Sequence, residues 1–170
     1  MTLVIDAIEL TLFPAMMAFA ASSDLFTMTI ANRVSLILVA GFGLLALLVG
    51  MSTAEMISHA GAAAVVLAIV FAMFTRGWIG GGDAKLAAAT VLWLGFAHLA
   101  DYLVYASLFG GALTLAIIQF RTMPLPRPFV GREWAERLHR LDAGVPYGIA
   151  LAAAALLVYP HTEWMAAITR

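Results

Sequence analysis

Residues 56–85 decide the fold of this chain; they read MISHAGAAAVVLAIVFAMFTRGWIGGGDAK. Residues 56–74 contain no Asp, Glu, Lys or Arg, and an apolar run of that length is typical of a helix that crosses a lipid bilayer. A glycine-rich turn follows, and Asp83 then stands at the mouth of the next apolar run, 84–99. The stretch therefore predicts two membrane helices joined by a turn, with a carboxylate beside the second helix.

The whole chain has the same apolar character. Of its 170 residues, 64% are hydrophobic and 11% are charged, and the mean hydropathy is +0.99. A soluble domain of this length cannot bury so much apolar surface in one core, so the composition indicates an integral membrane protein. The net charge of -1 gives no reason to expect a nucleic-acid partner. The absence of cysteine excludes disulfides, thiolate zinc sites and cysteine nucleophiles.

Six hydrophobic stretches approach the length of a membrane span. They are 3–21, 34–51, 56–74, 84–99, 101–120 and 147–166. The first is not typical of a cleaved signal peptide, because it contains Asp6 and Glu9 and has no Lys or Arg before its apolar run. We therefore expect an all-α polytopic protein with about six transmembrane helices, in which the first span is retained.

Lys and Arg indicate the orientation of these spans, because short cytoplasmic loops are enriched in them. Eight of the nine lie in alternate connections: Arg33 in the first, Arg76 and Lys85 in the third, and Arg121, Arg127, Arg132, Arg137 and Arg140 in the fifth. The pattern predicts that both termini lie outside and that the odd connections are cytoplasmic. Asp24, in the first connection, and Asp83, in the third, are thus predicted on the same cytoplasmic face.

The fifth connection, residues 121–146, is long enough to hold structure of its own. Within 131–142, helical spacing places Trp134, Leu138 and Leu141 on one face and the arginines elsewhere. This pattern predicts a short amphipathic helix that lies on the inner leaflet of the membrane.

Asp24 and Asp83 are candidate functional residues because a carboxylate is costly at the edge of a membrane span. Each also has a structural alternative: Asp83 as the cap of a helix that begins at Ala84, and Asp24 as a turn residue after Ser22 and Ser23. Their predicted placement on one face favours a shared function. Two carboxylates that share one proton can hydrolyse a peptide bond without a metal or a nucleophilic side chain.

Two segments also carry a family resemblance. Asp24–Arg33 reads DLFTMTIANR and Gly80–Leu86 reads GGGDAKL. As a spaced pair they resemble the type IV prepilin peptidases, which are intramembrane aspartyl proteases of the Gly-x-Gly-Asp class. The family usually has Ile-Pro-Asn after the first aspartate, and here Ala31 stands in place of the proline. Residues 145–150, VPYGIA, resemble the start of the last span in the small members that serve tight-adherence (Flp-type) pili.

The resemblance implies that Asp24 and Asp83 are the catalytic pair. It also implies supporting positions that orient the substrate or the first catalytic loop: Gly80, Gly81, Gly82, Lys85 and Asn32. Two interpretations of Lys85 stay open, since its ammonium either acts on the aspartates or the substrate, or extends to the cytoplasmic surface. No metal or other cofactor is expected, because the four histidines are scattered along the chain.

By the same resemblance, the substrate is a prepilin or pseudopilin whose short basic leader is cut off at the cytoplasmic face of a bacterial inner membrane, where lipid surrounds the enzyme. Larger family members carry a methyltransferase insertion near the N-terminus, often with a tetracysteine zinc site. This chain has a short first connection and no cysteine, so residues 1–170 resemble a single peptidase-only domain.

Other functions remain open at this point. A small ion- or proton-coupled transporter would also use membrane carboxylates, although it would place them near the bilayer centre and show repeated halves. A non-enzymatic scaffold of a secretion or pilus machine would leave the two spaced motifs unexplained. A presenilin-like protease would have Tyr before its first aspartate, where this chain has Ser23. The oligomeric state, the separation of the aspartates and the identity of the protonated one are also open.

Overall fold

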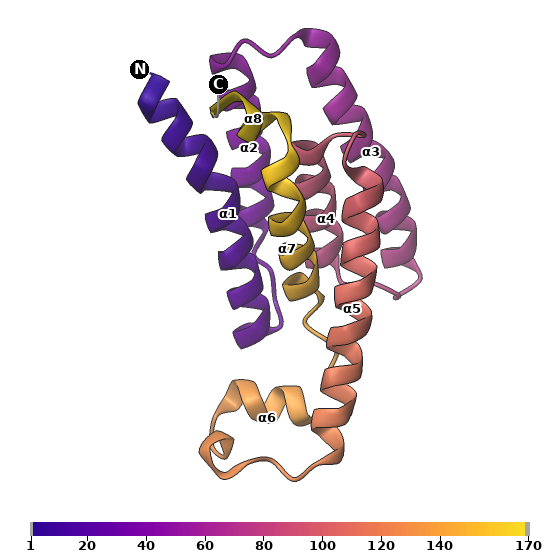
Figure 1. Ribbon diagram of the computed structural model, residues 1–170. Coiled ribbons are helices and arrows are strands. Elements are labelled where there is room, and N and C mark those ends of the chain that lie inside the picture. Colours follow the sequence, from indigo (N-terminus) through magenta and orange to yellow (C-terminus); the bar gives the residue numbers. More distant parts are fainter. Residues whose placement is uncertain (1, 169–170) are drawn as a thin grey trace.

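A computed structural model describes residues 2–168, and every regular element in that range is a helix (Figure 1). The elements are α1 (Thr2–Thr27), α2 (Asn32–Leu48), α3 (Thr53–Thr75), α4 (Gly81–Leu94), α5 (Leu99–Thr122), η1 (Arg127–Phe129), α6 (Glu133–His139), α7 (Tyr147–Val158), η2 (Tyr159–His161) and α8 (Glu163–Ile168). The protein is thus an all-α polytopic membrane protein, as predicted.

Each of the first five predicted spans corresponds to one helix, whereas the last, 147–166, is divided into α7, η2 and part of α8. The helices also differ in length. Among the described residues, α1 from Ile5 onward, α3 and α5 are long and apolar enough to cross a membrane alone. The other apolar helices, α2, α4 and α7, are shorter. The weakest predicted boundary, between the fourth and fifth spans, is a real turn, because Gly95 ends α4 with a positive φ of 67° and α5 begins at Leu99.

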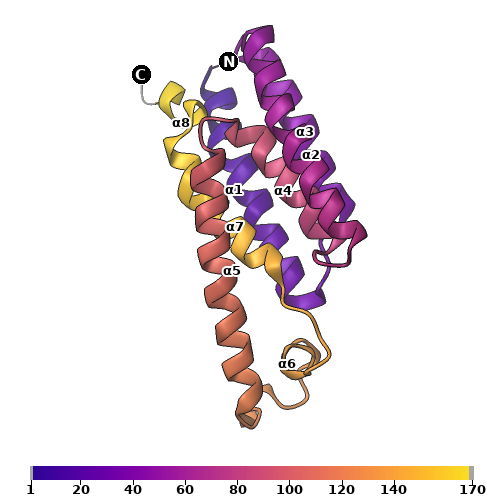
Figure 2. The ribbon, with the colours of Figure 1, turned by 90° about the vertical axis from the view of Figure 1, so that its right-hand side faces the viewer.

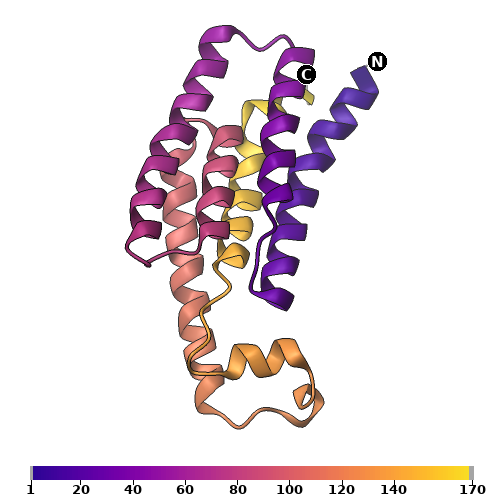
Figure 3. The same cartoon turned by 180° about the vertical axis from the view of Figure 1, so that it is seen from behind.

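Helix α4 is the centre of the bundle. It packs against α2, α3 and α7, and viewed from behind it lies between α3 and α2 (Figure 3). Its residues from Leu86 to Leu94 are buried almost throughout. A helix that is surrounded by other helices does not have to match the thickness of the bilayer, which accounts for its fourteen residues.

Aromatic side chains fill the core toward the end of the bundle where the described chain begins and ends. The indole of Trp93 donates a hydrogen bond to the Leu38 carbonyl at 2.9 Å, and the indole of Trp164 donates one to the Trp93 carbonyl at 2.9 Å. Both side chains are buried. These bonds satisfy the two buried N–H groups and fix α2, α4 and α8 to one another.

The predicted amphipathic helix is present as α6, but it is shorter than expected. It ends at His139, so Leu141 lies beyond it with 84% of its side chain exposed. The buried face of α6 consists of Ala135 and Leu138. The rings of Trp134 and of Phe26 in α1 pack at nearly a right angle, with their centroids 5.8 Å apart. In Figure 2 the lower half of α5 continues past the bundle and carries α6 beneath it.

Candidate active site

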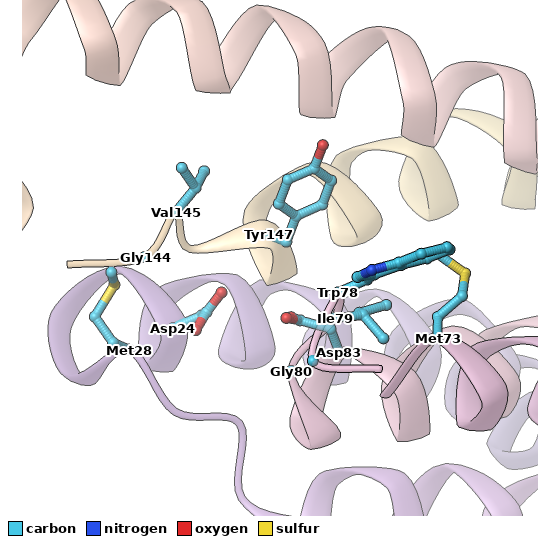
Figure 4. Close-up of a pocket in the computed structure, with 11 residues that line it drawn as sticks. Asp24, Met28, Met73, Trp78, Ile79, Gly80, Asp83, Gly144, Val145 and Tyr147 are labelled. Carbon is cyan, nitrogen blue, oxygen red and sulfur yellow. The ribbon is translucent and has the colours of Figure 1, made fainter. Parts of the chain in front are cut away.

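A pocket of about 670 Å³ lies at the end of the bundle that faces α6. Its walls come from the end of α1, the α3–α4 connection and the start of α7 (Figure 4). The lining residues are Asp24, Met28, Met73, Gly77, Trp78, Ile79, Gly80, Asp83, Gly144, Val145 and Tyr147. Because both candidate aspartates line it, we call it the aspartate pocket.

Asp24 lies in the last turn of α1, not in a connection as predicted, because α1 continues to Thr27. Its side chain is 5% exposed. One carboxylate oxygen, Oδ2, accepts a hydrogen bond of 2.7 Å from the backbone N–H of Gly148, a residue 124 positions away. Gly148 is the second residue of α7, and the N-cap of that helix, Pro146, provides no side-chain cap. Asp24 therefore satisfies a free N–H at the positive end of another helix.

The turn after α1 fixes the direction in which Asp24 points. Met28 adopts a left-handed conformation with φ of 56°, which ends the helix. The Ser23 hydroxyl donates to the Thr29 carbonyl at 2.8 Å, and the hydroxyls of Thr27 and Thr29 lie 2.7 Å apart. These side-chain bonds replace helical backbone bonds at the reversal, so the last turn of α1 is held in place.

Asp83 lies in the first turn of α4. The helix begins at Gly81 with Gly80 as its N-cap, so Asp83 is not the N-cap of a helix that begins at Ala84. Its carboxylate faces the backbone N–H of Gly80, as an acidic residue in a first helical turn often does. Figure 4 shows the carboxylates of Asp24 and Asp83 turned toward the same space.

The glycines before Asp83 allow the start of α4 to approach its neighbours. A Cβ added to Gly82 would lie 3.1 Å from the Cβ of Ile30, and one added to Gly81 would lie 3.2 Å from the ring of Phe74. Only Gly80 of the three lines the aspartate pocket. Gly81 and Gly82 thus bring α4 against α3 and the segment after α1, while Gly80 leaves backbone open to the pocket.

Lys85 and Asn32 lie together, but not in the aspartate pocket. The Lys85 ammonium donates a hydrogen bond of 2.8 Å to the Asn32 side-chain oxygen and joins α4 to the start of α2. Both residues line a separate apolar groove between α2, α3 and α4, which we call the α2–α4 groove. In this structure, then, they connect two helices and do not face the carboxylates.

The amino-acid sequence did not indicate the roles of two residues in the site. The backbone N–H of Gly148 binds the Asp24 carboxylate. Arg121 binds the chain segment that forms one wall of the pocket. The Arg121 guanidinium donates to the carbonyls of Leu138, Ala143 and Gly144 at 2.8, 2.9 and 2.8 Å. An arginine at the end of a membrane span is ordinary, and its partners depend on how the chain returns after α6. No local pattern in the sequence contains that information.

The chain matches a known family model. The model of the type IV leader peptidase family matches residues 11–115, which is more than half of the chain and includes both aspartates. The chain belongs to the type IV leader peptidase family. It is therefore a membrane protease of the leader-peptidase type. Searches of curated proteins and of solved structures found no match. Helix α7, with Gly148, lies outside the residues that match the leader-peptidase model.

Proposed function

We propose that this leader peptidase removes the short basic leader from Flp-type prepilins or pseudopilins, with Asp24 and Asp83 as its catalytic pair. The observation that carries the proposal is that these two carboxylates, from helices far apart in the sequence, face one pocket at the end of a membrane bundle. The family match supplies the reaction class, peptide hydrolysis. The site supplies the two acid–base groups that the reaction requires.

The proposed mechanism uses the two carboxylates in different protonation states. The ionised one removes a proton from water as the water attacks the scissile carbonyl. The protonated one donates a hydrogen bond to the developing oxyanion and then protonates the leaving amine. The Gly148 N–H donates a hydrogen bond to one carboxylate oxygen of Asp24. This bond fixes the orientation of the carboxylate before substrate binds.

The lining of the pocket suits a peptide at a boundary between polar and apolar segments. Gly80 and Gly144 present backbone without side chains, whereas Trp78, Ile79 and Val145 present apolar surface. A prepilin has this composition where its leader ends and its hydrophobic helix begins. The pocket faces the segment with the five clustered arginines, and the positive-inside rule therefore supports a cytoplasmic location in the bacterial inner membrane.

The transporter alternative has less support from the site. Asp24 and Asp83 lie in terminal turns of their helices, whereas carboxylates that bind transported ions near the bilayer centre would lie in the middle of theirs. No observation specifically favours a scaffold. We therefore propose the peptidase alone, as a single domain without a methyltransferase activity.

Leader removal in cells tests the proposal. The chain is co-expressed with a Flp-type prepilin in a host without its own prepilin peptidases, and leader removal is followed by immunoblot for the wild type, Asp24→Asn and Asp83→Asn. Asp101→Asn, an exposed carboxylate at the start of α5, is the matched control. We expect cleavage by the wild type and the control, and none by the two site variants at equal membrane levels. Cleavage by either site variant would show that the pair is not the catalytic unit.

A further inference from the structure

A second hollow adjoins the aspartate pocket at the side of the bundle. It is an apolar groove of about 400 Å³ between α3 and α5, lined also by Ala87 of α4 and by Tyr147 and Leu151 of α7, and we call it the α3–α5 groove. It shares three lining residues with the aspartate pocket: Met73, Ile79 and Tyr147. Figure 2 shows α3 and α5 on either side of α4, each packed on a different neighbour. The two hollows thus adjoin at these three residues.

The groove has the surface of a helix-binding site in a membrane. No residue that lines it is charged. Branched side chains of α3, such as Val66 and Ile69, form one wall, and small residues of α4 and α5, such as Ala87, Ala106 and Gly111, make the hollow. Small residues allow close approach of another helix where all surfaces are apolar. The groove spans about two helical turns of α3 (66–73) and nearly three of α5 (102–111).

A second apolar groove on the other side of α3 provides a comparison. The α2–α4 groove is larger, at about 570 Å³, and has Lys85 at its edge. It shares no lining residue with the aspartate pocket. Both grooves offer apolar surface to lipid, but of the two only the α3–α5 groove adjoins the pocket that Asp24 and Asp83 line. This shared border with the aspartate pocket, and not size, distinguishes a substrate path from an ordinary lipid-facing hollow.

We propose that the α3–α5 groove holds the first turns of the hydrophobic helix that follows the scissile bond of the substrate. This inference rests on the proposed function. A bond at the junction of a polar leader and an apolar helix requires two different environments on its two sides. The aspartate pocket faces the polar α6 segment, whereas the groove opens sideways between membrane helices. The substrate helix thus keeps its apolar surroundings during cleavage.

Tyr147 lies where the two hollows meet. A Cβ added to Gly110 would lie 2.5 Å from the Tyr147 ring, so the glycine allows the ring to rest on α5. Tyr147 immediately precedes Gly148, whose N–H holds Asp24. A helix in the groove would contact the residue next to the one that positions the carboxylate. Occupation of the groove is therefore expected to affect the rate of cleavage as well as the affinity.

Disulfide cross-linking tests the location of the substrate helix directly. The chain has no cysteine, so each variant carries a single thiol. Ser107→Cys lies in the α3–α5 groove, and Ser35→Cys, in the α2–α4 groove, is the matched control. Both are made with Asp83→Asn so that the substrate stays intact, and the prepilin carries one cysteine in the first two turns after its cleavage site. Membranes are oxidised with copper phenanthroline.

We expect Ser107→Cys to form a disulfide with the prepilin and Ser35→Cys to form several-fold less. Equal or weaker linkage at Ser107→Cys would overturn the proposal. Disulfides between two copies of the enzyme at this position, without linkage to the prepilin, would show instead that the groove is a self-association surface. If Ser107→Cys forms no disulfide with either protein, the groove holds only lipid, and the proposal is wrong.

Filling the groove tests the same proposal without cysteine. A Cβ added to Gly111 would have no atom within 4 Å, and the same is true of Gly43 on α2. Gly111→Leu therefore adds a side chain to the groove at a position where its Cβ meets no neighbour, and Gly43→Leu is the matched control. We expect kcat/KM for prepilin cleavage to fall on the order of tenfold in Gly111→Leu, with a smaller fall in Gly111→Ala, because contacts of one or two buried side chains are lost. Equal cleavage by Gly111→Leu and Gly43→Leu would contradict the proposal.

The two proposals fail in distinguishable ways. Cleavage by an Asp24→Asn or Asp83→Asn enzyme would refute the catalytic pair. Cleavage that depends on both aspartates, together with no selective linkage at Ser107→Cys and full activity of Gly111→Leu, would refute the groove alone.

Discussion

At the scale of single residues, the position of Asp24 depends on a glycine that is far away in the sequence. The N–H of Gly148 binds the Asp24 carboxylate. A Cβ added to Gly148 would lie 2.7 Å from Ile30 Cδ1 and 2.8 Å from Asp24 Oδ2. Both separations are shorter than ordinary contacts between such atoms. The site therefore has no space for a side chain at this position, and Asp24 would have to move to make it.

Gly148→Ala is predicted to displace the carboxylate without removing it. A displacement of about 1 Å at a catalytic group commonly costs on the order of 100-fold in rate, so we expect kcat/KM for prepilin cleavage to fall by about 10- to 100-fold. Gly43→Ala, in a position with open space, is the control for a glycine substitution within a membrane helix. Cleavage by Gly148→Ala at the wild-type rate would mean that the Gly148 contact does not position Asp24.

At the scale of elements, the connection from α6 to α7 forms a wall of the site, and Arg121 at the end of α5 holds it. The guanidinium binds three carbonyls, those of Leu138, Ala143 and Gly144. Gly144 and the residue after it line the aspartate pocket. The Arg137 guanidinium adds a bond of 3.0 Å to the Phe26 carbonyl, beside the end of α1. The arm that carries α6 is thus fixed to α5 and to the end of α1, and of these two helices α1 lines the site.

Arg121→Gln is predicted to loosen this wall. Hydrogen bonds from a charged donor contribute about 1.5–3 kcal/mol each, and less where water reaches them. We expect faster hydrogen exchange at residues 140–146 and a higher KM, with a smaller change in kcat because the carboxylates remain. Arg127→Gln, at an exposed arginine of the same arm, is the control. Unchanged exchange in Arg121→Gln would contradict the assigned role.

The end of α1 shows why some boundaries were not predictable from the sequence. Ser22, Ser23 and Asp24 are typical of a turn, yet all three lie in the helix. The Ser22 hydroxyl donates to the Ala18 carbonyl at 2.7 Å, so it is satisfied within the helix itself. The partner of Asp24 comes from α7. Local propensity predicted the turn, and a tertiary contact determined where it formed.

The placement of the two aspartates at one pocket was predictable, for a different physical reason. A carboxylate near a membrane requires either a partner or a function, and this requirement is visible in the sequence alone. The order of the helices and their alternating charges also placed Asp24 and Asp83 at one end of the bundle. The roles of Gly148 and Arg121 were not predictable, because each depends on contacts that only the folded chain creates.

At the scale of the whole molecule, the bundle has two different ends. The described chain begins and ends at one of them, and α6, within the arginine-containing segment 121–140, lies beyond the other (Figure 1). The aspartate pocket opens toward the α6 end. If arginines mark the cytoplasmic side, the start of α3 lies on the external side of the membrane and the α6 arm lies on the cytoplasmic side.

Single-cysteine labelling tests this orientation, since the natural chain provides no competing thiol. Thr53→Cys, at the start of α3, is exposed, and Leu141→Cys, after α6, replaces a side chain that is 84% exposed. A membrane-impermeable maleimide added to spheroplasts is expected to label Thr53→Cys at once and Leu141→Cys only after lysis. The reverse pattern would place the aspartate pocket on the outer face and would contradict the proposed substrate path.

The most direct test of the central claim, that Asp24 and Asp83 act as one catalytic unit, is a double-mutant cycle with purified enzyme and prepilin. The measured quantity is kcat/KM for leader removal by the wild type, Asp24→Asn, Asp83→Asn and the double variant. Each single substitution is predicted to cost about 1,000-fold or more, and the double variant is predicted to be about as slow as the slower single variant, because residues of one unit are not additive. A single variant that keeps more than about a tenth of the wild-type value, or losses that multiply in the double variant, would contradict the claim.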